Sequence, residues 1–281
     1  MTGVPKIFDR RIYAMRRRRT HESFLVRDAS EGLAARLLAV TRTFEHALDL
    51  SSREESFAVL KPFAANWTRT SLSGAGVVAE EDALPFAPES FDLVTSVLSL
   101  HAVNDLPGAL LQIRQVLKPD GLFLAALFGG ETLSELRRAF AAGESEAAGG
   151  ISPRVAPFAD VRSLGALLQR AGFALPVADS ERTNVRYAKF ETLVSDLRAL
   201  GETSALAERS RHFLPRAVLA ATLAHLQGTD RKFPATFEIV YLTGWSPHES
   251  QQKPLKPGSA KARLADALGV VEKIAGEKAP K

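Results

Sequence analysis

Residues 91–98 read Phe91-Asp92-Leu93-Val94-Thr95-Ser96-Val97-Leu98, a nearly continuous apolar run of strand length. An amphipathic stretch from Leu106 to Leu117 follows, with its apolar residues at helical spacing. The turn Pro119-Asp120-Gly121 then leads into a second apolar run from Leu122 to Phe128. Two apolar strands joined by a helix indicate a βαβ unit in a parallel sheet that is covered on both faces. The sequence therefore predicts an α/β fold.

The pattern of strands and helices continues on both sides of this unit. We expect a helix over 7–40, parallel strands at 46–50 and 76–79, antiparallel strands at 174–187 and 237–245, and a helix at 132–142 followed by a loop at 143–153. Three parts follow from this: a basic helical segment at 1–43, an α/β domain at 44–250 and a tail at 251–281. Within the tail, 260–275 has the composition of a short helix.

Composition excludes several kinds of site. The 281 residues contain no cysteine, so disulfides, thiolate metal sites and cysteine nucleophiles are excluded. The six histidines have no metal-ligand spacing, and no run of about 18 apolar residues predicts a membrane span. These features favour a cytoplasmic location.

Positive charge is concentrated at the N-terminus. Residues 1–20 hold seven Lys and Arg against one Asp, whereas the whole chain has a net charge of only +4. We expect Arg16 to Arg19 to be exposed, either as a solvated helix end or as a contact for an acidic partner or membrane. Nucleic acid is disfavoured because the remainder of the chain is slightly acidic.

Ligands of an open parallel sheet bind at the carboxyl ends of its strands. That rule selects residues 49–55, 80–82, 96–105 and 128–132. Among them, His101 is a candidate catalytic residue because it follows a strand end, although a lone histidine more often has a structural role.

Successive segments of the chain resemble the landmarks of class I S-adenosylmethionine-dependent methyltransferases. The landmarks are Ala47-Leu48-Asp49-Leu50, Leu84-Pro85-Phe86, Ser90 to Val94 and Leu117 to Gly121. Further segments are similar to the mitochondrial complex I assembly factor 5 family, which are arginine hydroxylases, and to the malonyl-carrier-protein methyltransferases of biotin synthesis. These segments are Leu98 to Pro107, Phe128 to Arg137, Gly149 to Pro153, Pro234 to Thr236 and His248 to Gln251.

This resemblance implies a Rossmann-like methyltransferase fold that binds S-adenosylmethionine. It implies that Asp49, Ser51 and Ser96 lie at the cofactor, and that Glu80 or Glu81 lies near the adenine amino group. The alternatives to cofactor binding are structural. Asp49 would then only end a strand, and the two glutamates would lie in a solvated acidic turn.

The chain departs from the family pattern at the cofactor loop. Where the family has glycines after Asp49, this sequence has Ser51, Arg53 and Glu55. Glycine is used there because the backbone must turn tightly and approach the ligand closely. The acid that holds the ribose hydroxyls has no match near Trp67 to Ser71. The spacing between 51 and 75 is also short for two crossovers, so we expect one connecting helix to be trimmed.

Two functions remain open at this point. The first is an enzyme, a methyltransferase or a related protein-arginine hydroxylase, whose substrate is a protein such as a respiratory complex I subunit. The second is a non-catalytic scaffold of the same fold that binds a respiratory-complex subunit after losing its cofactor site.

Overall fold

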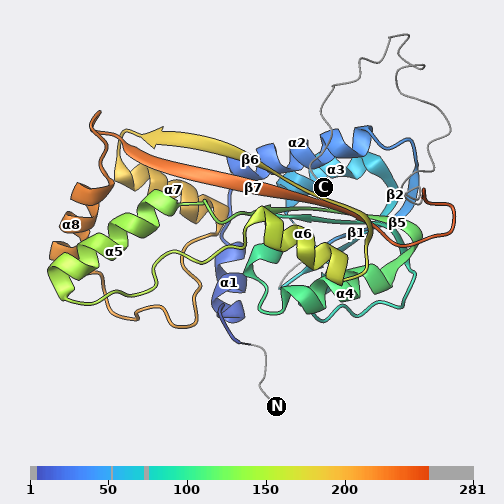
Figure 1. Ribbon diagram of the computed structural model, residues 1–281, viewed down its shortest axis with the longest axis horizontal. Helices are drawn as coiled ribbons and strands as arrows, with labels where there is room; N and C mark the ends of the chain where they lie inside the picture. The colour runs from blue at the N-terminus through green and yellow to red at the C-terminus, as the bar shows by residue number, and fades with distance from the viewer. Residues whose placement is uncertain (1–4, 52, 73–75, 253–281) are drawn as a thin grey trace, which may run out of the picture. The chain divides into compact units, whose positions relative to one another are not determined.

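The computed structural model describes residues 5–51, 53–72 and 76–252, and residues up to His248 group into one compact unit. Within the described residues, one sheet has the strand order β3-β2-β1-β4-β5-β7-β6 (Figure 1). Its strands are β1 (Phe44–Asp49), β2 (Ala64–Ser71), β3 (Val77–Val78), β4 (Phe91–Val97), β5 (Leu117–Phe128), β6 (Ala174–Tyr187) and β7 (Phe233–Trp245). Strands β1 to β5 run parallel, and β7 is antiparallel to both β5 and β6. The predicted mostly parallel sheet is confirmed.

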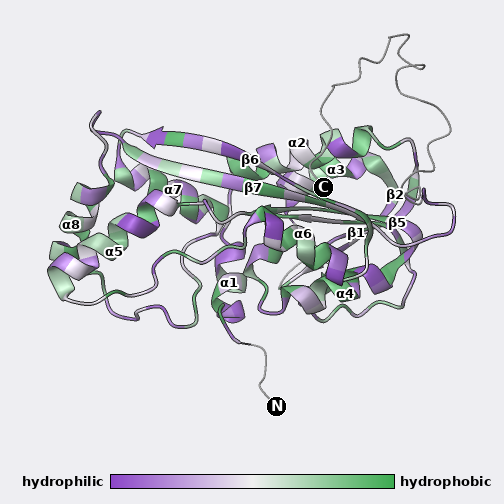
Figure 2. Ribbon diagram, viewed as in Figure 1, coloured by the Kyte–Doolittle hydropathy of each residue, from purple (hydrophilic) through white to green (hydrophobic). Residues whose placement is uncertain are grey.

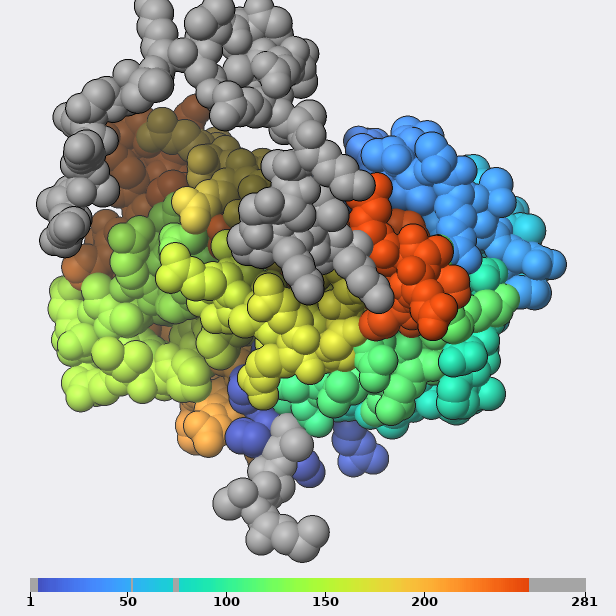
Figure 3. All heavy atoms as spheres, turned by 45° about the vertical axis from the view of Figure 1, so that its right-hand side comes forward, coloured from blue at the N-terminus to red at the C-terminus, as the bar shows by residue number. Residues whose placement is uncertain are grey.

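Helices cover both faces of this sheet. They are α1 (Arg10–Arg17), α2 (Phe24–Leu38), α3 (Glu54–Leu60), α4 (Leu106–Val116), α5 (Ser134–Ala148), α6 (Val161–Arg170), α7 (Phe190–Leu200) and α8 (Arg216–Leu226). Figure 1 shows α2 and α3 on one side of the sheet and α4 and α6 on the other. Helices α4 and α6 also contact one another, and their surfaces adjoin in Figure 3.

The central strands β4 and β5 contribute alternate side chains to two separate apolar cores. Leu93 belongs to the core that contains residues of α2, α5, α7 and α8, whereas its neighbour Val94 belongs to the core that contains residues of α4 and α6. In β5, three residues belong to the same core as Leu93, namely Leu122, Leu124 and Ala126. The residues between them, Phe123 and Ala125, belong to the same core as Val94. Figure 2 shows the apolar character of these central strands. Because both faces are buried, these strands are mostly apolar, as the sequence predicted.

Some element boundaries differ from the prediction. The helix expected over 7–40 is divided into α1 and α2 by residues 18–23, and α5 continues to Ala148, through the first half of the predicted loop. The second strand in sequence is β2, and the predicted strand at 76–79 is the two-residue β3. Alternating polar residues in β2 concealed its strand character, because this strand is only partly buried. The helix predicted at 260–275 lies outside the described residues, and the domain boundaries at 43 and 250 stay a prediction.

The trimmed crossover lies between β2 and β3. These strands are parallel neighbours, with Thr70 opposite Val77, and only residues 72–76 separate them in the sequence. A parallel crossover that carries a helix needs at least about 10–12 residues. The connection between β2 and β3 is therefore too short for the helix that usually covers this edge.

Candidate functional site

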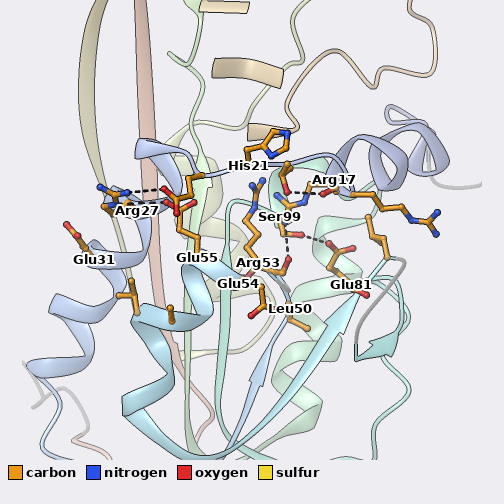
Figure 4. Close-up of a pocket in the computed structure, with 18 of the residues that line it drawn as sticks. Arg17, His21, Arg27, Glu31, Leu50, Arg53, Glu54, Glu55, Glu81 and Ser99 are labelled. Carbon is orange, nitrogen blue, oxygen red and sulfur yellow. Dashed lines mark hydrogen bonds and ion pairs between the residues drawn. The ribbon is translucent and has the colours of Figure 1, made fainter. Parts of the chain in front are cut away.

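A cleft of about 740 Å³ opens at the carboxyl ends of β1 and β2 (Figure 4). Its walls come from the end of α1, the segment before α2, the loop after β1, α3 and the residues after β3 and β4. The lining residues are Arg17, Arg18, Thr20, His21, Glu22, Arg27, Glu31, Leu50, Ser51, Arg53, Glu54, Glu55, Ala58, Val59, Ser71, Leu72, Ala79, Glu81 and Ser99. This is the edge of the sheet where ligands of parallel folds bind.

The loop after β1 is held by the side chains that replace the family's glycines. Asp49 accepts a hydrogen bond from the Ser51 backbone N–H at 2.9 Å and another from the Ser51 hydroxyl. Arg53 donates from Nη2 to the Leu200 carbonyl at 2.9 Å, at the end of α7. Glu55 accepts from the Ser23 backbone N–H at 3.1 Å, directly before α2. The side chains of Arg53 and Glu55 thus make tertiary contacts, whereas that of Ser51 bonds locally to Asp49.

The last turn of α1 holds the strand ends together. Arg17 donates from Nη1 to the Leu98 carbonyl at 3.0 Å and from Nη2 to the Ser51 carbonyl at 3.1 Å. Leu98 has a φ of +46°, a left-handed conformation that side chains other than glycine rarely adopt. Such strain persists only where surrounding contacts maintain it, and it is concentrated at functional sites. Arg17 therefore stabilises the turn that follows β4.

The acidic segment after β3 is also held by α1. Arg10 forms ion pairs with Glu80 at 2.8 Å and with Glu81, and it donates to the Ala102 carbonyl at 2.8 Å. Glu81 is buried and accepts from the Ser99 hydroxyl at 2.5 Å. Glu81 therefore has a partner on each carboxylate oxygen, and Ser99 links this segment to β4.

A buried carboxylate, Glu202, lies between the cleft and a second cavity. It contacts His101 Nε2 at 3.1 Å and accepts from the Tyr13 hydroxyl at 3.1 Å, while Arg17 and Arg53 lie 3.9 and 3.8 Å away. Burial opposes ionisation of Glu202, but His101, Arg17 and Tyr13 together hold its pKa below the ordinary value. Because Glu202 is ionised, His101 Nε2 must donate the hydrogen bond between them.

The second cavity has a volume of about 190 Å³ and is mainly apolar. His101 borders it, with its ring 4.9 Å from that of Phe128 and 5.4 Å from that of Phe158. Burial raises the pKa of Tyr13, which keeps this phenol protonated beside Glu202. Arg17 and Arg53 line the cleft and Glu202 lines the cavity, so their ion pairs form the wall between the two spaces.

The predicted site residues are distributed unevenly around these spaces. Ser51 and Glu81 line the cleft. Glu80 is half exposed and forms an ion pair with Arg10. Asp49 is buried behind Ser51. Ser96 is fully buried within β4 and is not among the residues that line the cleft, whereas Ser99, which follows the strand end, lines it.

Sequence reasoning missed Arg17 and Glu202 as site residues. Their positions are set by α1 and by the segment after α7, and neither lies in a strand-end motif. The expectation that Arg16 to Arg19 are all exposed is wrong for Arg16 and Arg17, which are half-buried and bonded to backbone carbonyls. A run of arginines cannot show which members face the protein, because helical periodicity directs neighbours to different sides.

Two motifs have structural roles. Gly129 lies against the buried Glu238, whose Oε2 would be 2.5 Å from an added Cβ, so a side chain there is excluded. Asp105 caps α4 by accepting from the Gly108 N–H at 2.9 Å. Asn104 does not share this cap, because its side chain bonds both backbone groups of Phe8 at 2.8 and 3.1 Å. It thereby fixes the segment that precedes α1.

The cleft residues fit a zwitterionic ligand that carries an additional positive charge. Four arginines (Arg17, Arg18, Arg27 and Arg53) and five glutamates (Glu22, Glu31, Glu54, Glu55 and Glu81) line it. The lining thus combines both signs of charge with a slight acidic excess. S-adenosylmethionine has a carboxylate, an ammonium and a sulfonium, so its charges match this donor set. Among the described residues, no cluster of metal-ligating side chains is found, and no helix is long and apolar enough to span a membrane.

Comparisons with known proteins agree with this geometry. Residues 29–125 match the methyltransferase domain family. The chain is 39% identical to the mitochondrial arginine-hydroxylase NDUFAF5 of Danio rerio, over 86% of this chain and 81% of that protein. It is 37% identical to the Homo sapiens protein of that name, over 91% and 79% of the two chains. A malonyl-[acyl-carrier protein] O-methyltransferase of Xylella fastidiosa is 38% identical over 58% of this chain and 55% of that protein.

Solved structures show the same fold. A putative methyltransferase from Bacillus halodurans superimposes with a TM-score of 0.52 at 14% identity, covering 76% of this chain and 99% of that one. The YcgJ protein of Bacillus subtilis gives 0.54 at 13% identity, covering 78% and 98%. The predicted methyltransferase fold is therefore confirmed.

Proposed function

Because the chain belongs to the methyltransferase-fold family of the NDUFAF5 arginine hydroxylases, we propose that it binds S-adenosylmethionine in the cleft and modifies an arginine of a protein substrate. The observation that carries this proposal is the cleft itself. Its mixed-charge lining lies where β1 and β4 end, beside a buried carboxylate and histidine. The substrate that the family resemblance favours is a subunit of respiratory complex I. A cytoplasmic location, at or near the inner membrane, stays a prediction.

The residues available to hold the cofactor come from three strand ends. We assign its amino-acid end to the turn formed by Asp49 and Ser51, and its ribose to the Ser71 hydroxyl. Glu80 or Glu81 is assigned to the adenine. When bound, the cofactor supplies a methyl group that the positive sulfonium activates for transfer. The protein's contribution is to bind and orient both reactants and to exclude water, because such a donor needs little acid–base assistance.

Binding of the cofactor is expected to be weak. Ser51, Arg53 and Glu55 put side chains where backbone would otherwise approach the ligand, and the ribose has no carboxylate partner. Each lost hydrogen bond is worth about 0.5–1.5 kcal/mol, or up to about 3 kcal/mol when charged. Two such losses weaken binding by about one to several powers of ten, since about 1.4 kcal/mol corresponds to tenfold.

Calorimetric titration with S-adenosylmethionine and its homocysteine product tests the cofactor site. We expect weak binding to the native protein and binding at least about tenfold tighter to a variant with glycine at 51, 53 and 55. Micromolar affinity in the native protein would show that the substituted loop does not impair the site. Loss of binding in both proteins would favour the scaffold function, in which the fold serves only to bind a respiratory-complex subunit.

The chemical outcome is tested by mass spectrometry of a complex I subunit incubated with protein and cofactor, in parallel samples with and without dioxygen and a reductant. Hydroxylation needs this oxygen source and these electrons, because S-adenosylmethionine supplies only a methyl group. A gain of one oxygen on arginine identifies hydroxylation, and a gain of one methyl group identifies methylation. A stable complex with an unmodified subunit would contradict catalysis and support the scaffold.

A further inference from the structure

Four arginines surround a hollow of about 380 Å³ that shares no lining residue with the cofactor cleft. It is lined by Arg16, Pro153, Arg154, Ser204, Arg209, Ser210 and Arg211. Two acidic residues pair with this group: Asp9 lies 3.4 Å from Arg209, and Glu144 lies 2.6 Å from Arg154. The hollow therefore keeps an excess of positive charge.

The arginines of this hollow repel one another. Arg16 donates to the carbonyls of Thr203 and Ser204, which hold its guanidinium in place. Burial and the positive charge of Arg209 both lower the pKa of Arg16. Like charges held at short range are unfavourable, and an anion placed among them relieves that repulsion. The Ser204 hydroxyl is also buried without a hydrogen-bond partner in the described part of the chain.

The hollow adjoins the apolar cavity described above. Arg154 and Ser204 line both spaces, so the two adjoin at these residues. Aromatic rings, among them Phe128 and Phe158, form much of the cavity wall. Its volume of about 190 Å³ exceeds the roughly 150 Å³ in which an engineered apolar cavity binds benzene. A carboxylate, Glu202, also borders the cavity, so an anionic group would be repelled from its interior and drawn toward the arginines.

We propose that the arginine hollow and the apolar cavity form one binding site for a molecule with an oxyanion at the end of an apolar group. The phosphate or carboxylate binds among Arg154, Arg209 and Arg211. The apolar group enters the cavity between β5, α5 and α7, where it contacts the aromatic side chains. The Ser204 hydroxyl lies at the junction and can donate to the oxyanion.

Benzyl phosphate and phenethyl phosphate test this site by calorimetry, with inorganic phosphate, benzyl alcohol and benzylammonium as comparisons. Burial of the ring should make the better phosphate ester bind about ten- to a hundredfold tighter than inorganic phosphate. Benzyl alcohol and benzylammonium should bind more weakly than the ester, because they lack the oxyanion. Equal binding of ester and inorganic phosphate would show that the cavity takes no part. Equal binding of the ester and benzylammonium would exclude an oxyanion site.

Variants separate the two halves of the site. Arg211→Gln should weaken binding of the ester about three- to tenfold, whereas Arg211→Lys, which keeps the charge, should retain most of the affinity. Arg162→Gln, an exposed arginine on α6, is the matched control and should change nothing. If Arg162→Gln weakened binding equally, the anion would be attracted by the overall charge of the protein and not by the hollow, and the proposal would be overturned.

Filling the cavity gives the complementary test. Val194→Phe on α7 should reduce affinity for the ester to that for inorganic phosphate, while phosphate binding stays unchanged. If this variant fails to fold, Ala156→Leu on the opposite wall serves the same purpose. Undiminished ester binding in a folded cavity-filling variant would place the ring elsewhere and contradict the proposal. These measurements need no cofactor, so they do not depend on the function proposed for the cleft.

Discussion

The unit from β4 to β5 and the region from β1 to β3 belong to the same sheet but are stabilised differently. In β4 and β5 nearly every side chain is buried in apolar cores on both faces. In the β1–β3 region, β2 is only partly buried, β3 has two residues and the loop after β1 is held by charged side chains. The difference shows that the fold depends on the apolar centre, whereas the cofactor edge can change its residues when the new side chains gain partners.

The largest effect is expected in the apolar centre. Leu93→Ala removes a fully buried side chain from β4 and should lower the free energy of unfolding by about 2–5 kcal/mol. Leu38→Ala is the matched control, because Leu38 is 77% exposed, and it should have little effect. Urea denaturation of both variants measures the difference. Equal losses would refute the view that the centre of the sheet carries the stability.

Glu202→Gln tests the wall between cleft and cavity. Loss of the charge should reduce stability at neutral pH by about 1.5–3 kcal/mol, because His101, Arg17 and Arg53 lose their anionic partner. The pKa of Glu202 in the folded protein is below its usual value of 4.5. The stability that the Glu202 carboxylate provides is therefore present above pH 4.5 and is lost as the pH falls through the folded pKa. Denaturation measured across the acid range should therefore show the unfolding free energies of the native protein and the variant becoming equal as the pH falls. A gap that stays constant into acid would mean that the charge is not responsible.

The variant with glycine at 51, 53 and 55 should change stability and affinity in opposite directions. It loses the bonds from Arg53 to Leu200 and from Ser23 to Glu55, and it adds backbone freedom. We expect about 1–2 kcal/mol lower stability together with tighter S-adenosylmethionine binding. Melting curves and titrations of the same samples check both. A more stable glycine variant would mean that these side chains do not support the loop.

The smallest effect is expected at the end of the arginine run. Arg19→Ala should change stability by no more than about 0.5 kcal/mol, because Arg19 is exposed. Arg17→Ala, two positions away, should cost more, since it removes hydrogen bonds to the carbonyls of Leu98 and Ser51. Thermal melting of the two variants side by side resolves the difference. Identical melting temperatures would contradict the role of Arg17 in holding the strand ends.

The parts of the fold that could be predicted are those where local pattern and tertiary environment agree. Most buried residues between 91 and 128 are apolar, so their periodicity shows both strands and the helix between them. β2 was missed because its exposed edge admits polar residues such as Asn66 and Arg69. At the site, Ser51 and Glu81 follow strand ends and line the cleft, whereas Ser96 is buried within β4 and is not among the lining residues. Contact of these residues with a cofactor stays a prediction.

The sequence by itself determined the unit from β4 to β5, the parallel sheet, the shortened crossover and the replacement of the three loop glycines. All of these depend on residues close together in the chain, where spacing and side-chain type act directly. Only the tertiary structure decided that Arg17, Arg53, His101 and Glu202 meet between two cavities, and that Arg16 and Arg209 face one hollow. These residues come from segments up to about two hundred positions apart, and a contact at that separation is set by how helices pack on the sheet, which local sequence pattern does not specify.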